Sequence, residues 1–254
     1  MVAAGAAFNR WAGGSDGRAR KTGGYHPAMP TSSTAVTAST AVTGAANSPT
    51  ALDPDLAARV QVVFCDVDGV LTDGGMTYGA VRRDAGGIDR DAIHGSPLDD
   101  VQPLESKRFH VRDGMAAVLL RLAGLKVVFI TGERTEMVRR RAAKLKLDGC
   151  IDGCDDKAPA AAAWLARHGL TPAAAMHIGD EVNDIGLMRT LPLSLAPADC
   201  SPVVADVASV VLATPGGHGV LREAAYALLT ARGELVETIE RYISGERPGT
   251  GSAT

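Results

Sequence analysis

Two aspartates spaced two residues apart, Asp66 and Asp68, follow an apolar run over residues 62–65. A short run of β-branched and apolar residues predicts a buried strand, and ligands of open parallel sheets bind just beyond the carboxyl ends of strands. Carboxylates there can act as a nucleophile, a general acid–base or a metal ligand. An EF-hand calcium loop is excluded, because its fifth, sixth and twelfth positions would hold valine, leucine and threonine instead of an oxygen ligand, glycine and glutamate.

Polar side chains also follow two later apolar runs. The first run ends in Thr131 and Gly132, and the second leads into a cluster of acids that includes Asp180 and Asp184. Between these two runs, Lys157 follows an Asp-Asp turn. The carboxyl ends of neighbouring parallel strands meet at one edge of a sheet, so these groups are expected to gather near the first two aspartates.

Together and in this order, the four groups resemble the four sequence motifs of the haloacid dehalogenase (HAD) superfamily of phosphohydrolases. The resemblance implies that Asp66 is a nucleophile that attacks phosphorus and forms an aspartyl-phosphate. It implies that Asp68 protonates the leaving alkoxide and then deprotonates the water that hydrolyses this intermediate. HAD phosphatases have an acid at the second position of this Asp-Val-Asp sequence, whereas dehalogenases and P-type pumps have other residues there. The expected reaction is hydrolysis of a phosphate monoester.

The resemblance also implies a magnesium ion, which would shield an anionic carboxylate as it approaches an anionic phosphate. Asp66, the main-chain carbonyl of Asp68 and Asp180 are the expected ligands. Asp184 lies four residues after Asp180 and on the same face of the following helix. It would support the metal waters or Lys157.

The phosphate-binding side of the expected site consists of Thr131, Gly132, Lys157 and Asn183. The Thr131 hydroxyl and the Gly132 amide would donate to phosphoryl oxygens, and Lys157 would balance charge in the transition state. Asn183 would support the same set of groups. Glu181, in the same acidic cluster, is better explained as a helix N-cap.

The composition is typical of a globular enzyme. The chain has 254 residues, 46% of them hydrophobic and 22% charged, with a net charge of −3, which is enough to bury one core. The slight acidity and the absence of a long basic block argue against a nucleic-acid partner, and no apolar run approaches the ~18 residues that a membrane span requires. Of the four cysteines, Cys150 and Cys154 are closely spaced but lack a second pair of thiols or histidines to complete a zinc site, so we expect reduced thiols and a cytoplasmic location.

Residues 1–55 are expected to be a disordered extension, because they have no sustained apolar period and are rich in Ala, Ser, Thr and Gly. Their basic, acid-poor composition is also typical of an organellar transit peptide, and Met29 leaves an over-long gene start open as well. The HAD phosphatase domain is expected over residues 56–245. Residues 246–254 are expected to form a second disordered tail.

Strands alternate with helices along residues 56–245, which predicts a parallel sheet in a three-layer, Rossmann-like α/β fold. His177 lies within one of these strands and is expected to be a packed core histidine. Further strands are expected at 126–130, 174–178, 191–195 and 207–212, and helices at 52–59, 113–122, 133–147, 158–168, 220–231 and 234–243.

Two short segments with strand character, 74–79 and 107–111, are predicted to pair as a hairpin flap. In the HAD subfamily of 3-deoxy-D-manno-octulosonate 8-phosphate (KDO-8-phosphate) phosphatases, such a hairpin replaces the large cap domain, and the resemblance to it spans about residues 62–241. Residues 80–106 are expected to be a solvated loop insertion in this flap. His218 and Glu133 stand where the subfamily usually has arginine.

The expected function is magnesium-dependent hydrolysis of a phosphorylated sugar acid such as KDO-8-phosphate. Two alternatives stay open: a phosphatase for the nine-carbon analogue KDN-9-phosphate, and a non-catalytic HAD oligomerisation module related to acylneuraminate cytidylyltransferases. A hairpin alone leaves the pocket open to water on one side. The subfamily covers the pocket by forming a tetramer, so a homotetramer is expected, with the apolar hairpin residues Met76, Tyr78, Phe109 and Val111 buried in it.

Overall fold

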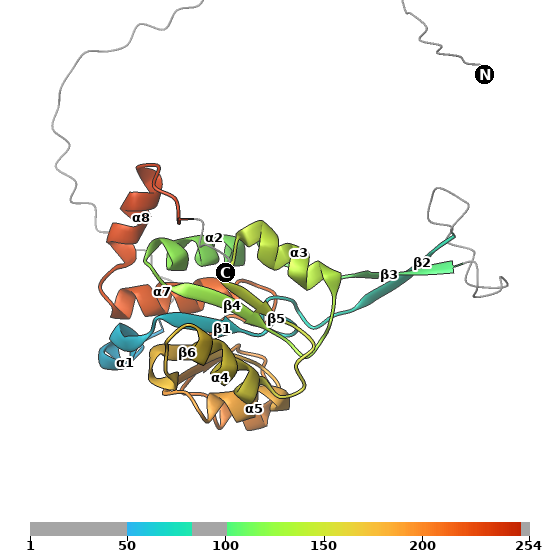
Figure 1. The fold of residues 1–254 in the computed structure, drawn as a ribbon, viewed down its shortest axis with the longest axis horizontal. Coiled ribbons are helices and arrows are strands. Elements are labelled where there is room, and N and C mark those ends of the chain that lie inside the picture. The colour runs from blue at the N-terminus through green and yellow to red at the C-terminus, as the bar shows by residue number, and fades with distance from the viewer. Residues whose placement is uncertain (1–49, 83–100, 250–254) are drawn as a thin grey trace, which may run out of the picture. The chain divides into compact units, whose positions relative to one another are not determined.

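The computed structural model describes residues 50–82 and 101–249. These residues form a six-stranded sheet and a separate two-stranded sheet (Figure 1). All pairings in the larger sheet are parallel, and its strand order is β5-β4-β1-β6-β7-β8. Its strands are β1 (Val62–Cys65), β4 (Lys126–Ile130), β5 (Gly149–Ile151), β6 (Ala175–Ile178), β7 (Leu193–Ala196) and β8 (Val210–Val211).

Helices cover both faces of this sheet (Figure 1). Successive residues of β1 point to opposite faces, so Val63 and Cys65 belong to the core cluster that includes α2 and α7, whereas Val62 and Phe64 belong to the cluster with α4 and α5. Both faces of β1 are therefore buried, which explains its continuous apolar run and confirms the predicted three-layer α/β fold. The helices are α1 (Pro54–Arg59), α2 (Val111–Leu122), α3 (Glu136–Leu145), α4 (Lys157–Arg167), α5 (Val182–Met188), α6 (Pro202–Ala205), α7 (Val220–Ala231) and α8 (Leu235–Ile243), with a short 3-10 turn at Pro172–Ala174.

Most predicted elements are present, and the predictions for β4 and α7 match the structure to the residue. The helix predicted at 133–147 is shorter, because the Thr135 side chain caps α3 and Lys146 ends it in the left-handed conformation with φ of 54°. Strand β5 was not predicted. Its three residues include a glycine and a cysteine and are too few to show a hydrophobic period.

The hairpin differs from its prediction. Its two antiparallel strands are β2 (Thr77–Arg82) and β3 (Val101–Ser106), so the second arm predicted at 107–111 was wrong. Helix α2 begins at Val111, earlier than predicted, because the His110 side chain accepts a hydrogen bond from the Arg112 amide and caps the helix. The four residues from 107 to 110 therefore link the hairpin to the core.

The predicted loop insertion at 80–106 is strand at both of its ends, and its central residues 83–100 lie outside the described residues. The same holds for residues 1–49 and 250–254, which contain most of the two predicted disordered segments. Helix α1 starts at Pro54, inside the predicted N-terminal extension. The domain limits otherwise stay predictions.

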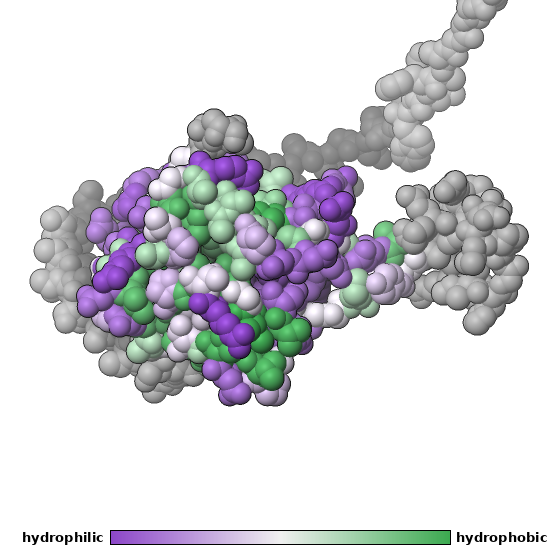
Figure 2. All heavy atoms as spheres, turned by 60° about the horizontal axis from the view of Figure 1, so that its bottom comes forward, coloured by the Kyte–Doolittle hydropathy of each residue, from purple (hydrophilic) through white to green (hydrophobic). Residues whose placement is uncertain are grey.

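The face on which α4 and α5 lie mixes hydrophilic and hydrophobic side chains (Figure 2). Within the described ranges, no helix combines the length and apolar character needed to cross a membrane. All four cysteines of the sequence are described and are free thiols, and Cys65 is the buried one among them.

Candidate active site

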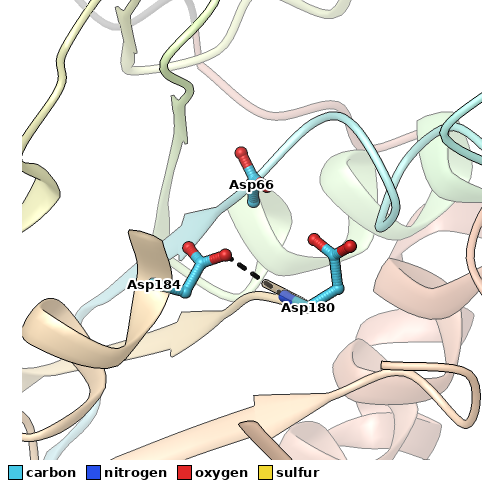
Figure 3. Close-up of side chains that lie close together, drawn as sticks. All are labelled: Asp66, Asp180 and Asp184. Atoms are coloured by element: carbon cyan, nitrogen blue, oxygen red, sulfur yellow. Dashed lines mark hydrogen bonds between the residues drawn. The ribbon is translucent and has the colours of Figure 1, made fainter. Parts of the chain in front are cut away.

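Three carboxylates meet at the carboxyl edge of the sheet (Figure 3). Asp66 directly follows β1, Asp180 lies in the turn after β6, and Asp184 lies in α5. One oxygen atom of each lies within 4.8 Å of the others. Because β1 and β6 pair in parallel, with Cys65 opposite Ile178, the residues that follow the two strands emerge side by side. The structure thus brings together three of the predicted site residues.

The surroundings of Asp66 and Asp180 fit a divalent cation. Asp180 Oδ1 is buried and has no hydrogen-bond partner among the described residues. Burial raises the pKa of Asp66 to about 7 and that of Asp180 to about 6, so the surroundings do not fully compensate for the burial of either negative charge. A hard cation that prefers oxygen ligands would supply the missing interaction. This cluster can therefore hold a divalent metal ion.

Lys157 places a buried positive charge beside the carboxylates. It is the first residue of α4, whose start is fixed by the Asp156 side chain accepting the Ala158 amide. Its Nζ lies 2.9 Å from Asp66 Oδ1 and 2.7 Å from Asp184 Oδ1, and its side chain is inaccessible to solvent. Burial by itself would lower the pKa of Lys157, but the two carboxylates raise it. The lysine is therefore charged where it contacts Asp66.

Asp184 is surrounded by hydrogen-bond donors. Lys157 donates to Oδ1, and His177 Nε2 lies 2.6 Å from the same oxygen. The backbone amides of Asp180 and Glu181 donate to Oδ2 at 3.2 and 3.3 Å. Burial alone would raise the pKa of Asp184, but His177 and Lys157 lower it to about 2. With both oxygens engaged, Asp184 is better suited to orient Lys157 than to bind the cation itself. Its role as a support for the metal waters or Lys157 stays a prediction.

Two neighbours of Asp184 behave as the sequence indicated. Glu181 is the N-cap of α5 and forms a reciprocal capping box with Asp184. His177 is fully buried in β6, as predicted, but its contact with Asp184 was not foreseen, because the strand pattern does not show which side chain from the next helix will reach it.

A cavity of about 300 Å³ opens in front of the carboxylates. Thr131 follows β4 and is buried, and its hydroxyl accepts a hydrogen bond from the Glu133 amide. Lys157 and Asp184 are not part of the cavity wall and support it from behind. Six of the eight predicted site residues therefore face one cavity, which is lined by Asp66, Asp68, Gly69, Gly74, Thr131, Gly132, Glu133, Asp180, Glu181 and Asn183.

Asp68 is held by two neighbours. The Thr72 hydroxyl lies 3.2 Å from its Oδ1, and Lys107 Nζ lies 2.7 Å from its Oδ2. Lys107 also forms an ion pair with Glu133. Lys107 was not predicted as a site residue but as part of a hairpin strand. A lysine in a polar link gives no sign of the carboxylate it will meet, so only the path of the chain reveals this contact.

The glycine-rich segment 216–219 packs on the loop that follows Asp68. The Gly217 amide donates to the Val70 carbonyl at 3.0 Å. A Cβ atom on Gly216 would lie 2.2 Å from the Gly69 carbonyl oxygen, so only glycine allows this close approach. The His218 ring turns back on its own segment, with Nδ1 2.6 Å from the Gly216 carbonyl oxygen. The segment thus braces the loop that carries the aspartates.

Gly69→Ala should weaken binding of a divalent cation. A Cβ at this position would lie 1.9 Å from Asp180 Oδ2, so the Asp180 carboxylate would have to move. We expect affinity for Mg²⁺ in a calorimetric titration to fall by about tenfold or more. Gly124→Ala is the matched control, since Gly124 has a similar φ of +85° but nothing within 4 Å of the added atom. Equal Mg²⁺ affinity in the two variants would argue against Asp180 as a ligand.

Comparison with known proteins supports the same class of site. A family model described as haloacid dehalogenase-like hydrolase matches residues 78–190. The 3-deoxy-D-manno-octulosonate 8-phosphate phosphatase of Yersinia pestis is 31% identical over 179 residues, which cover 70% of this chain and 84% of the relative. The Haemophilus influenzae protein of the same name is 33% identical over 176 residues, which cover 69% and 86%.

A solved structure shares the fold. The crystal structure of 3-deoxy-D-manno-octulosonate 8-phosphate phosphatase from Moraxella catarrhalis, in complex with a magnesium ion, a phosphate ion and KDO, matches with a TM-score of 0.63 and 25% sequence identity. The match covers 74% of this chain and 97% of the Moraxella chain.

The chain therefore belongs to the haloacid dehalogenase-like hydrolases, and it is a phosphoric monoester hydrolase. Within this class, the curated relatives described above are KDO-8-phosphate phosphatases, which confirms the resemblance indicated by the four motifs. The part of this chain that the family model matches begins at residue 78, after Asp66 and Asp68. The roles of these two aspartates rest on the motif and on the geometry of the site.

Proposed function

We propose that the protein is a magnesium-dependent phosphatase that hydrolyses KDO-8-phosphate through an aspartyl-phosphate on Asp66. The observation that carries this proposal is the contact between the buried Lys157 and Asp66, beside an Asp180 oxygen that has no hydrogen-bond partner within the described ranges. These three side chains provide a nucleophile, a charge-balancing cation and an oxygen ligand for a metal. The names of the relatives and the KDO bound to the Moraxella protein support the choice of substrate.

In the first step, a carboxylate oxygen of Asp66 attacks phosphorus, and the bond between phosphorus and the sugar oxygen breaks. Asp68 gives its proton to the departing oxygen. The Thr131 hydroxyl and the Gly132 amide donate to phosphoryl oxygens, and Lys157 offsets the negative charge that gathers around Asp66. The products are the free sugar acid and phosphorylated Asp66.

In the second step, Asp68 takes a proton from a water molecule, whose oxygen attacks phosphorus. The bond between phosphorus and Asp66 breaks, which releases inorganic phosphate and restores the carboxylate. Magnesium held by Asp66, Asp180 and the main-chain carbonyl of Asp68 would supply positive charge against the phosphate. Asp184 keeps Lys157 directed at Asp66, and Asn183 lies in the cavity wall near the phosphate-binding groups.

Phosphate release from a small panel of esters tests the proposal. The panel contains KDO-8-phosphate, KDN-9-phosphate and a hexose 6-phosphate, each assayed with Mg²⁺ and with a chelator. We expect the highest kcat/KM for KDO-8-phosphate, loss of turnover with the chelator, and recovery when Mg²⁺ is added back. A higher kcat/KM for KDN-9-phosphate would change the assigned substrate to KDN-9-phosphate and leave the proposed reaction unchanged. No turnover of any ester would favour a non-catalytic module.

We further propose a homotetramer in which hairpins cover the sites. Three apolar hairpin residues are well exposed: Met76 by 42%, Tyr78 by 70% and Leu104 by 45%. A two-stranded ribbon cannot bury such side chains by itself, which favours a covering partner. Phe109 is not one of these residues, because it packs against the main core and under the Arg141 guanidinium. Its predicted place in the flap was wrong, and Val111 is an exposed residue of α2.

Light scattering at assay concentration should give the mass of four chains. Tyr78→Asp should lower this mass, because a charge would be buried without a partner at the interface. Tyr226→Asp is the matched control, since Tyr226 is an exposed tyrosine on α7. A fully active monomer would contradict the proposed assembly.

A further inference from the structure

Lys107 joins three segments that are distant in the sequence. It directly follows β3 and belongs to the link between the hairpin and α2. Its Nζ contacts Asp68 in the loop after β1 and Glu133 in the loop after β4. Only 1% of the Lys107 side chain is exposed, although its two partners are 29% and 40% exposed. The side chain of the lysine is therefore covered by its neighbours where it contacts the site.

The charges around Lys107 hold it in this place. Burial would lower the pKa of Lys107, but hydrogen bonds and charge interactions with Asp68 and Glu133 raise it. A buried ammonium group without such partners would be costly. Lys157 contacts a different pair, Asp66 and Asp184. The site thus contains two buried lysines, and each of them holds one of the two aspartates of the Asp-Val-Asp sequence.

Both oxygens of Asp68 have a partner. Thr72 donates to Oδ1 from the same loop, while Lys107 donates to Oδ2 from the hairpin link. A carboxylate on a loop would otherwise sample several rotamers, and only some of them would reach the leaving oxygen. Misplacement of a reacting group by about 1 Å can cost about a hundredfold in rate. Holding Asp68 through Lys107 of the hairpin link should therefore affect the rate of the reaction directly.

We propose that Lys107 is a positioning residue that holds Oδ2 of Asp68 and so orients Oδ1, the oxygen that carries the transferred proton. The hairpin link thereby contributes to the geometry of the reacting groups. Glu133 gives Lys107 a second anchor on the β4 side of the cavity. The inference rests on the proposed role of Asp68 as general acid–base.

If the ion pairs of Lys107 only stabilised the base of the hairpin, loss of Lys107 should affect all substrates alike. If Lys107 orients a general acid, its removal should matter most when the leaving oxygen needs a proton. An alkoxide leaves poorly without one, whereas p-nitrophenolate leaves readily. The value of kcat/KM reports the steps up to departure of the leaving group. The ratio of kcat/KM for an alkyl ester to kcat/KM for an aryl ester therefore measures how much the reaction depends on protonation of the leaving oxygen.

The experiment compares kcat/KM for p-nitrophenyl phosphate with kcat/KM for the alkyl phosphate that wild type turns over best. The Asp68→Asn variant shows how much kcat/KM for each ester falls when the general acid is lost. For Lys107→Met we expect a loss of at least about tenfold on the alkyl ester and about threefold or less on the aryl ester. Lys107→Arg, which keeps the charge, should regain most of the alkyl activity. Lys126→Met is the matched control at the start of β4, the opposite end of that strand from the site.

The outcomes separate this inference from the proposed function. Suppose that Lys107→Met lowers kcat/KM equally for both esters, while Asp68→Asn lowers it mainly for the alkyl ester. This result would overturn the inference and leave the proposed function standing. No alkyl-selective loss in Asp68→Asn would overturn the role of Asp68 and, with it, the inference. Adding Lys107→Met to Asp68→Asn should cost about twofold or less, because the group to be positioned is gone. If Lys107→Met does not fold, Lys107→Gln is measured in the same way.

Discussion

Asp66→Asn should abolish phosphate release while the protein stays folded. The change removes the attacking carboxylate and a metal ligand but keeps the volume of the side chain, so we expect a loss on the order of 10⁴-fold or more in kcat. The amide oxygen of asparagine can still accept the hydrogen bond from Lys157, which lies 2.9 Å from Asp66 Oδ1 in the wild type. The melting temperature should therefore change little.

Asp55→Asn is the control for this experiment, because Asp55 is an exposed aspartate in the first turn of α1. It should keep full activity. Wild-type enzyme quenched during turnover should carry a phosphoryl group on the peptide that contains Asp66, detectable by mass spectrometry. Substantial turnover by Asp66→Asn would remove Asp66 from its role as nucleophile.

Lys157→Met should reduce both activity and stability. Methionine fills most of the same space, but Asp66 and Asp184 would lose the cation between them. Removing one partner from a buried ion pair costs about 3–5 kcal/mol of unfolding free energy, and we expect the lower end because His177 still contacts Asp184. The loss of a charge that stabilises the transition state should lower kcat by about 10³-fold.

Urea unfolding and steady-state kinetics measure the two effects separately. Lys126→Met, the same substitution at the far end of β4, should change neither the unfolding free energy nor kcat appreciably. A Lys157→Met protein that is destabilised but keeps activity within tenfold of wild type would show that Lys157 supports the fold and not the reaction.

The predictable part of the site consists of residues whose position follows from a single strand or helix. Asp66, Thr131 and Asp180 each stand just after a predicted strand, and parallel pairing alone brings such residues to one edge. Lys157 could be assigned because its place in the order of motifs outweighed the general preference of lysine for the surface. Local sequence was sufficient for the residues that follow the strands, whereas Lys157 needed the order of the motifs.

The unpredicted part depends on contacts between segments that no local pattern records. His177 reaches Asp184 because β6 and α5 lie side by side, and Lys107 reaches Asp68 because the chain returns from the hairpin beside the β1 loop. The hairpin limits were missed for a related reason. The stretch 101–106 contains a proline and a glutamate and was assigned to a solvated loop, yet pairing with β2 makes it a strand.

The hairpin enters the chain between β1 and α2, and this position affects how such an enzyme can diverge. The pairing of β1 with β4 and β6 involves no hairpin residue, so insertions and deletions at the hairpin tip leave the register around Asp66 unchanged. A lineage can therefore change the length and surface of the hairpin while it keeps the arrangement of residues around Asp66. If Lys107 orients Asp68, selection would act against changes at the junction with α2 even where the hairpin itself is free to drift.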